Sequence, residues 1–219
     1  MKLLLTSSGL TNDSIVNALR ELAGKPFDDL SLAFIPTAAN LEKGDKSWLI
    51  RDLDNSGKLG FKAIDVVDIS AIDKKLWLPR LEKANILLFG GGNTYHLSYF
   101  INKSGLKEIL PKLLEEKVYV GISAGSIIAT HSLVFSNQEK KEFAESIGES
   151  PGDEGLGFVK FHIRPHLNNP KFPHAILDAV ESKAKNFTET VYAIDDQTAI
   201  KVDGKTITVI SEGEWKKFN

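Results

Sequence analysis

Short apolar runs alternate with longer segments of helical periodicity over the first 130 residues. The runs are almost wholly hydrophobic, which is typical of strands buried on both faces, and they span 2–6, 31–36, 63–69, 85–90 and 118–123. Apolar residues recur at helical spacing between polar or glycine caps in the intervening segments 12–24, 45–60, 71–84 and 106–117. This order predicts right-handed crossovers and a parallel sheet that helices cover on both faces.

The pattern changes after residue 131. We expect a polar surface loop with at most one helical turn over 136–155. The segments 157–166, 173–185 and 190–195 then predict a strand that Pro165 ends, a helix and another strand. Two alternating runs over 198–210, joined by Asp-Gly, predict a C-terminal β-hairpin. Because no repeat or linker divides the chain, we expect a single α/β domain over residues 1–219.

Composition narrows the function classes. The chain has 219 residues, 42% of them hydrophobic and 26% charged, as in an ordinary globular protein. A formal net charge of −2 gives no reason to expect a nucleic acid or a membrane surface as partner. The first apolar run is too short for a secretory signal or a membrane span, so we expect a cytoplasmic protein.

The absence of cysteine excludes several mechanisms. A thiolate nucleophile, a disulfide redox cycle and a thiolate-bound metal all need that residue. His162 and His166 have the spacing of a helical metal-binding pair, but Pro165 and the strand pattern around them argue against a helix. We therefore expect neither a metal nor a cofactor, and any covalent catalysis must use oxygen or nitrogen.

Two strands break sharply into helical patterns, at "LLFGGGNTYHL" (87–97) and at "VYVGISAGSII" (118–128). The second contains Gly121-Ile122-Ser123-Ala124-Gly125, which fits the G-x-S-x-G elbow of serine hydrolases. Small flanking residues let the chain turn so tightly there that the serine projects above the sheet. The structural alternative is a glycine-rich turn that packs a helix close to the sheet.

A nucleophilic serine needs a base, which is usually a histidine. His131 is eight residues further along the predicted helix, about 12 Å from Ser123, and cannot reach it. His174 is expected on a surface helix and His162 inside a strand. His166 directly follows the proline that ends a strand, so it is expected at the carboxyl edge of the sheet, where Ser123 also lies. His166 is therefore the predicted base.

The third member of a triad would be a carboxylate at another strand end. Asp195 and Asp196 lie where a strand breaks before the hairpin, although either alone also fits an ordinary acidic turn. The resulting order of serine, histidine and acid differs from the order in the usual hydrolase fold with this elbow.

The glycine run that follows the strand 85–90 has two interpretations. Its amides, together with the amide of Ala124, could stabilise the negative oxygen that forms when a carbonyl is attacked. A glycine run before a helix can instead cradle a phosphate, but neither the dinucleotide-binding spacing nor a Walker lysine is present.

Four sequence blocks now match a known family. "FGGGNTYHL", "GISAGSII", "GLGFVKFHIRPHLNNP" and "IDDQTAI" occur in the order and approximate spacing of the dipeptidase E and cyanophycinase family of serine peptidases, and the chain resembles that family over nearly its whole length. The resemblance implies a flavodoxin-like three-layer α/β sandwich with a mainly parallel central sheet, related to class I glutamine amidotransferases.

The resemblance also implies residue roles. Ser123 is the implied nucleophile, His166 the base and Asp196 the acid, with Asp195 as a substitute for it. The implied oxyanion donors are Gly91, Gly92 and Ala124.

The implied reaction is hydrolysis of short peptides through an acyl-enzyme, and the expected substrates are dipeptides with an N-terminal aspartate. Arg164 is the candidate cation for the aspartate carboxylate, and Asn93 is a second candidate for substrate binding. Segment 132–155 has no clear counterpart in dipeptidase E. The alternative is a non-catalytic member of the fold that binds a small ligand or partner at the strand ends. Nothing in the sequence indicates the oligomeric state.

Overall fold

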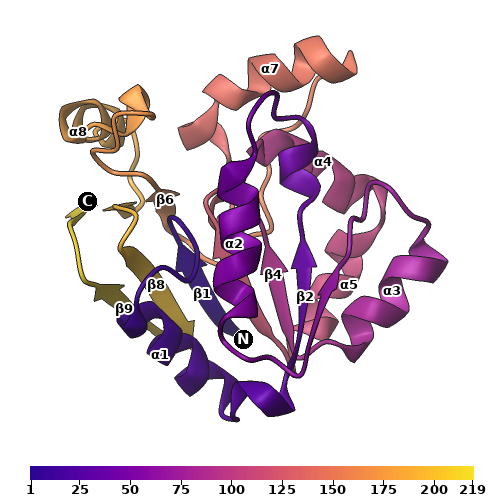
Figure 1. Ribbon diagram of the computed structural model, residues 1–219. Coiled ribbons are helices and arrows are strands. Elements are labelled where there is room, and N and C mark those ends of the chain that lie inside the picture. Colours follow the sequence, from indigo (N-terminus) through magenta and orange to yellow (C-terminus); the bar gives the residue numbers. More distant parts are fainter.

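Seven strands form the central sheet in a computed structural model that describes residues 1–219, apart from the side chain of Gln138. Their order across the sheet is β3-β2-β4-β5-β1-β8-β9. Neighbours from β3 to β1 pair in parallel, whereas β8 and β9 are antiparallel. The predicted mainly parallel sheet and the C-terminal hairpin are therefore confirmed (Figure 1).

The elements have the following bounds. The strands are β1 (Lys2–Thr6), β2 (Ser31–Ile35), β3 (Ala63–Val66), β4 (Ile86–Phe89), β5 (Val118–Ile122), β6 (His162–Arg164), β7 (Val191–Ile194), β8 (Thr198–Asp203), β9 (Thr206–Ser211) and β10 (Trp215–Phe218). The α-helices are α1 (Asp13–Ala23), α2 (Ser47–Gly57), α3 (Lys74–Lys83), α4 (Thr94–Lys103), α5 (Leu106–Leu113), α6 (Ala124–Ile127), α7 (Gln138–Ile147) and α8 (Leu177–Ala184). The 3-10 turns are η1 (Phe27–Asp29), η2 (Thr37–Asn40), η3 (Val134–Ser136) and η4 (Pro173–Ala175). No helix in the described part of the chain is long and apolar enough to cross a membrane.

Successive side chains of the buried strands point to opposite faces of the sheet, so the protein has two hydrophobic cores. In β1, Leu4 faces α1 and α2, whereas Leu3 and Leu5 face the layer that contains α3, α4 and α5. Figure 1 shows α1 and α2 on one face of the sheet. Both sheet faces are thus covered, as the predicted three-layer sandwich requires.

A second, smaller sheet was not expected from the sequence. It has the order β10-β7-β6, in which β6 and β7 are parallel and β10 is antiparallel to β7. It packs with α8 around a separate apolar cluster that includes Phe135, Leu167 and Val180. The expected strand over 157–166 is regular only over the three residues of β6.

The expectation of a surface loop over 136–155 was wrong. The segment contains the helix α7, which packs against α4. Phe143 is its apolar anchor: the ring is fully buried, and its centroid lies 5.3 Å from that of Tyr99. A single large side chain in a polar segment gives little periodicity, so the sequence pattern did not reveal this contact.

The turn from β5 into α6 depends on two glycines. A Cβ at Gly125 would lie 2.1 Å from the backbone oxygen of Phe89 in β4, and a Cβ at Gly121 would lie 2.6 Å from the carbonyl carbon of Gly125. The first turn of α6 can therefore rest directly on the ends of β4 and β5 only because these positions lack side chains.

We predict that Gly125→Ala lowers the free energy of unfolding by about 1–3 kcal/mol or more, because backbone must move to admit the methyl group. Gly57→Ala is the matched control, since a Cβ there meets no atom within 4 Å. Urea unfolding of both variants measures the difference. Equal stability of the two variants would contradict the close approach of α6 to β4.

Candidate active site

Ser123 lies at the point where β5 ends and α6 begins. Its backbone is strained, with φ 48° and ψ −105°, in a region that non-glycine residues rarely adopt. Such conformations cost on the order of 1–3 kcal/mol and persist only where the surrounding structure holds them. The Ser123 amide donates to the backbone carbonyl oxygen of Thr6 (3.1 Å). The backbone carbonyl oxygen of Ser123 accepts from the amides of Ser126 and Ile127. These bonds fix the serine above the carboxyl edge of the sheet.

His166 follows the end of β6 and reaches the serine. Its Nε2 lies 2.9 Å from the Oγ of Ser123. The backbone of His166 also has a positive φ of 63°, and its amide donates to the Oγ of Ser7 (2.8 Å). The imidazole stacks on the ring of Phe172, with centroids 4.0 Å apart and planes 8° apart. Both the backbone and the ring of His166 are therefore held in place.

Asp196 completes a chain of contacts between the three predicted residues. Its Oδ1 lies 2.7 Å from the Nδ1 of His166. Ser7 donates from its Oγ to the same oxygen (2.8 Å), and Asn169 donates from its Nδ2 to Oδ2 (2.7 Å). The structure thus brings Ser123, His166 and Asp196 together from three separate parts of the chain.

The environment of Asp196 favours the ionised carboxylate. Burial raises the pKa of this carboxyl, but the hydrogen bond and charge of His166 and the donors of Ser7 and Asn169 outweigh burial and lower the pKa to about 2. A carboxylate in this state can stabilise a positively charged imidazole and fix a proton on its Nδ1.

Asp195, the alternative acid, lies in a different environment. Its Oδ1 accepts from the amide of Gln197 (3.0 Å) and the hydroxyl of Thr198 (2.6 Å), and its Oδ2 accepts from the amide of Glu214 (2.6 Å). These bonds stabilise the turn between β7 and β8. Asp195 therefore holds the loop that carries Asp196, whereas His166 Nδ1 bonds to Asp196 and, among the described side chains, not to Asp195.

Three of the residues around this centre were missed by sequence reasoning. Ser7 contacts both Asp196 and His166, yet "TSSG" after a strand is typical of any polar turn. Asn169 and Phe172 lie in the polar segment after β6, where nothing in the pattern distinguishes them. The parallel arrangement of β1 and β5 was the available signal for Ser7, because their carboxyl ends meet at one edge.

The glycine run lies beside the serine. A Cβ built on Gly91 would be 3.5 Å from the Cβ of Ser123. Gly92 has a φ of 126°, and a Cβ there would lie 2.4 Å from the oxygen of Ala38. Among the described residues, the amides of Gly91, Gly92 and Ala124 donate no backbone hydrogen bond outside regular elements. Gly91 and Ala124 therefore offer unused amides beside Ser123, and Gly92 is the next residue of the same run.

Asn93 and Arg164 occupy buried positions. Asn93 caps α4: its Oδ1 accepts from the amide of His96 (2.9 Å), and its Nδ2 donates to the oxygen of Glu139 (3.1 Å). Both ends of its amide are thus used within the fold. Arg164 is 8% exposed, and its Nε has no hydrogen-bond partner among the described residues. Burial lowers the pKa of Arg164, while the nearby Glu139 carboxyl raises it.

The remaining histidines are away from the serine contact. His131 lies beyond the end of α6 rather than within a long helix, because α6 ends at Ile127. His162 begins β6, at the opposite end of that strand from His166. His174 is an exposed residue of η4.

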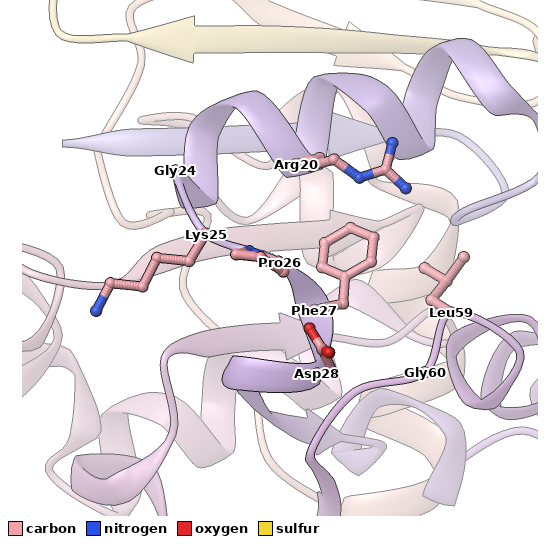
Figure 2. A pocket seen from close by; sticks show the side chains of 8 residues that line it. All are labelled: Arg20, Gly24, Lys25, Pro26, Phe27, Asp28, Leu59 and Gly60. Atoms are coloured by element: carbon pink, nitrogen blue, oxygen red, sulfur yellow. The ribbon is translucent and has the colours of Figure 1, made fainter.

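A shallow surface depression lies elsewhere on the molecule. Figure 2 shows this depression, about 670 Å³ in volume, with Arg20, Phe27 and Leu59 among its lining residues. It is formed by the end of α1, η1 and the loop after α2. These segments precede β2 and β3, so the depression is at the amino edge of the sheet, opposite the serine.

We predict a pH-dependent stability difference between the parent and Asp196→Asn. The lowered pKa means that the ionised carboxylate stabilises the fold above the unfolded pKa of about 3.9, and that this stabilisation is lost as the pH falls towards about 2. Urea unfolding should show the parent more stable at pH 7 by on the order of 1–2 kcal/mol, and a shrinking difference below about pH 4. Asp28→Asn controls for removal of an exposed charge. A difference that stays constant from pH 7 to pH 2 would contradict the electrostatic account.

Comparisons with known proteins find relatives that are described as peptidases. An uncharacterized peptidase of Pasteurella multocida is 25% identical over 210 residues, which cover 94% of this chain and 96% of the relative. A protein named peptidase E from a Nostoc species is 27% identical over 201 residues, which cover 85% of this chain and 78% of the relative.

The fold is also shared with a solved structure. A crystal structure from Listeria monocytogenes, provisionally described as peptidase E, superposes with a TM-score of 0.82 at 22% identity and covers 97% of this chain and 98% of its own. The model of peptidase family S51 matches residues 3–210. Because that match spans nearly the entire sequence, the chain belongs to peptidase family S51 and is a serine peptidase.

Proposed function

We propose that Ser123, His166 and Asp196 form the catalytic triad of this peptidase. The observation that carries the proposal is the continuous chain of contacts from the Ser123 Oγ to His166 Nε2 (2.9 Å) and from His166 Nδ1 to Asp196 Oδ1 (2.7 Å). In this chain Asp196 holds the proton on Nδ1, so that the Nε2 lone pair faces the serine hydroxyl.

The proposed reaction has two halves. In the first, Ser123 attacks the peptide carbonyl while Nε2 of His166 accepts the hydroxyl proton, and the imidazolium then gives that proton to the leaving amine. In the second, water attacks the acyl-enzyme with His166 as base, and the proton returns to the Ser123 oxygen as the acid product leaves. The ionised Asp196 stabilises the imidazolium in both halves.

Backbone amides supply the proposed oxyanion hole. Gly91 or Gly92 is one donor and Ala124 is the other, because these amides lie beside Ser123 and are not used in the fold's backbone hydrogen bonds among the described residues. Donors of this kind act on charge that develops only in the transition state, and the loss of one typically costs about 10²–10³ in kcat.

The substrates in this proposal are short peptides, in the first instance dipeptides with an N-terminal aspartate. The resemblance to dipeptidase E supports this class, and Arg164 offers a cation two residues before His166. The Glu139 carboxyl is close enough to raise the pKa of Arg164, so the two side chains together set the charge that a substrate carboxylate would meet. In this proposal Asn93 affects substrate binding only by positioning α4, because its side-chain amide caps that helix.

We predict that Ser123→Ala lowers kcat by on the order of 10⁶-fold, because the nucleophile is removed while the fold is kept. A fluorophosphonate probe should label the parent stoichiometrically at Ser123 and leave Ser123→Ala unlabelled. Ser126→Ala is the matched control, since Ser126 lies in α6, the helix that begins directly after Ser123, but its hydroxyl donates to the backbone oxygen of Thr6. A folded parent without labelling would support a non-catalytic member of the fold, and equal peptide cleavage by Ser123→Ala would refute the nucleophile.

We predict that kcat/KM for Asp-Leu exceeds that for the neutral isostere Asn-Leu by at least about tenfold, the effect of one charge-assisted hydrogen bond. Arg164→Gln should reduce this ratio towards one. A dipeptide panel that varies only the first residue, with release of leucine as readout, measures the preference. Equal rates for the two peptides would refute the substrate class and leave the triad assignment untouched.

A further inference from the structure

Three side chains capable of binding a metal meet at a point that the proposed reaction does not use. They are His131, His162 and Glu189, and one ligand atom from each lies within 4.8 Å of the others. The Nε2 of His131 lies 3.4 Å from Oε1 of Glu189, and the Nε2 of His162 lies 4.0 Å from Oε2. Two imidazoles and one carboxylate are the ligand set of many three-residue zinc sites, in which water or another ligand takes the fourth position.

The spacing of these atoms is close to what a zinc ion requires. Tetrahedral Zn²⁺ with bonds of about 2.0–2.2 Å holds its ligand atoms roughly 3.3 Å apart. The separation between His131 and Oε1 of Glu189 is close to this value, and the separation between His162 and the other oxygen, Oε2, exceeds it by less than one ångström. The ligand nitrogens of the two imidazoles lie within 4.8 Å of each other, so they must also move closer together. Rotation of the exposed Glu189 and His131 side chains can remove the excess, since these are 38% and 40% exposed.

The third ligand, His162, is held by packing. Its imidazole is 2% exposed and lies between Phe187, 4.6 Å away by ring centroids, and Phe135, 6.0 Å away. The His162 amide also donates to the oxygen of Thr190 (2.8 Å), which fixes the backbone beside Glu189. His162 is thus preorganised and would lose little entropy when a metal binds, whereas His131 and Glu189 can adjust their positions.

The cluster is separate from the serine centre. His162 is the first residue of β6 and Glu189 precedes β7, whereas His166 follows the other end of β6. Four residues of extended chain span about 13 Å. His131 comes from the segment after α6, so an ion at this point would join that segment to the starts of β6 and β7.

We propose that His131, His162 and Glu189 form a binding site for one divalent transition-metal ion of the zinc class, with an open fourth position. The ion stabilises the small sheet that carries His166, and it takes no part in the attack on the peptide. The competing explanation is an ordinary ion pair between His131 and Glu189 at the surface.

The test uses full-length protein treated with a chelator and then titrated with Zn²⁺ by calorimetry and with Co²⁺ by visible absorption. The parent should bind one equivalent at this site, and His131→Ala and Glu189→Gln should each weaken the affinity by at least about tenfold. His174→Ala is the matched control, because it removes an exposed histidine elsewhere. Glu189→Gln keeps the shape of the side chain and so guards against a variant that does not fold, which circular dichroism would reveal.

A second measurement separates this site from metal bound at the proposed triad. Zn²⁺ should raise the melting temperature of the parent and of Ser123→Ala alike, and raise it less in Glu189→Gln. No binding by the parent, or unchanged affinity in both His131→Ala and Glu189→Gln, would overturn the proposal. Either result would leave the proposed role of Ser123 as nucleophile untouched, since probe labelling tests that role separately.

Discussion

The contact of Gly125 with the backbone oxygen of Phe89 is the constraint on which the arrangement of this site depends. Because no side chain separates α6 from the end of β4, the helix begins immediately after β5 and Ser123 must turn through a strained conformation. That turn projects the hydroxyl above the sheet. Packing within the core thus determines where the chemistry can occur.

Two sheets contribute to the centre, and Ser7 joins them. Ser123 and Ser7 follow β5 and β1 of the large sheet, whereas His166 and Asp196 follow β6 and β7 of the small one. The Ser7 hydroxyl accepts from the His166 amide and donates to the Asp196 carboxylate. These two hydrogen bonds hold the end of β1 in the large sheet next to the ends of β6 and β7 in the small sheet. A hydroxyl suits this position because it both donates and accepts.

The sequence was informative where burial imposes a regular pattern. Wholly apolar strands, helical spacing and the glycines around Ser123 predicted the parallel sheet and the elbow, because each reflects a local steric or solvation requirement. His166 and Asp196 were predicted from their positions at strand ends and from the family resemblance. Contacts made by isolated residues were missed: Phe143 anchors α7 without any periodicity, and His131 meets Glu189 across 58 positions of the sequence with no local pattern to indicate it.

The short loop from His166 to η4 contacts the side chains of both His166 and Asp196. Phe172 stacks on the imidazole, Asn169 binds the carboxylate of Asp196, and Asn168 accepts from the amide of Leu177 at the start of α8. Displacement of this loop would remove the Phe172 contact of the His166 imidazole and the Asn169 contact of the Asp196 carboxylate together, so the positions of the two side chains are coupled. Substitutions along the loop should consequently have non-additive effects on stability, and a ligand that displaces the Phe172 ring would disturb the contact between His166 and Ser123 without touching Ser123 itself.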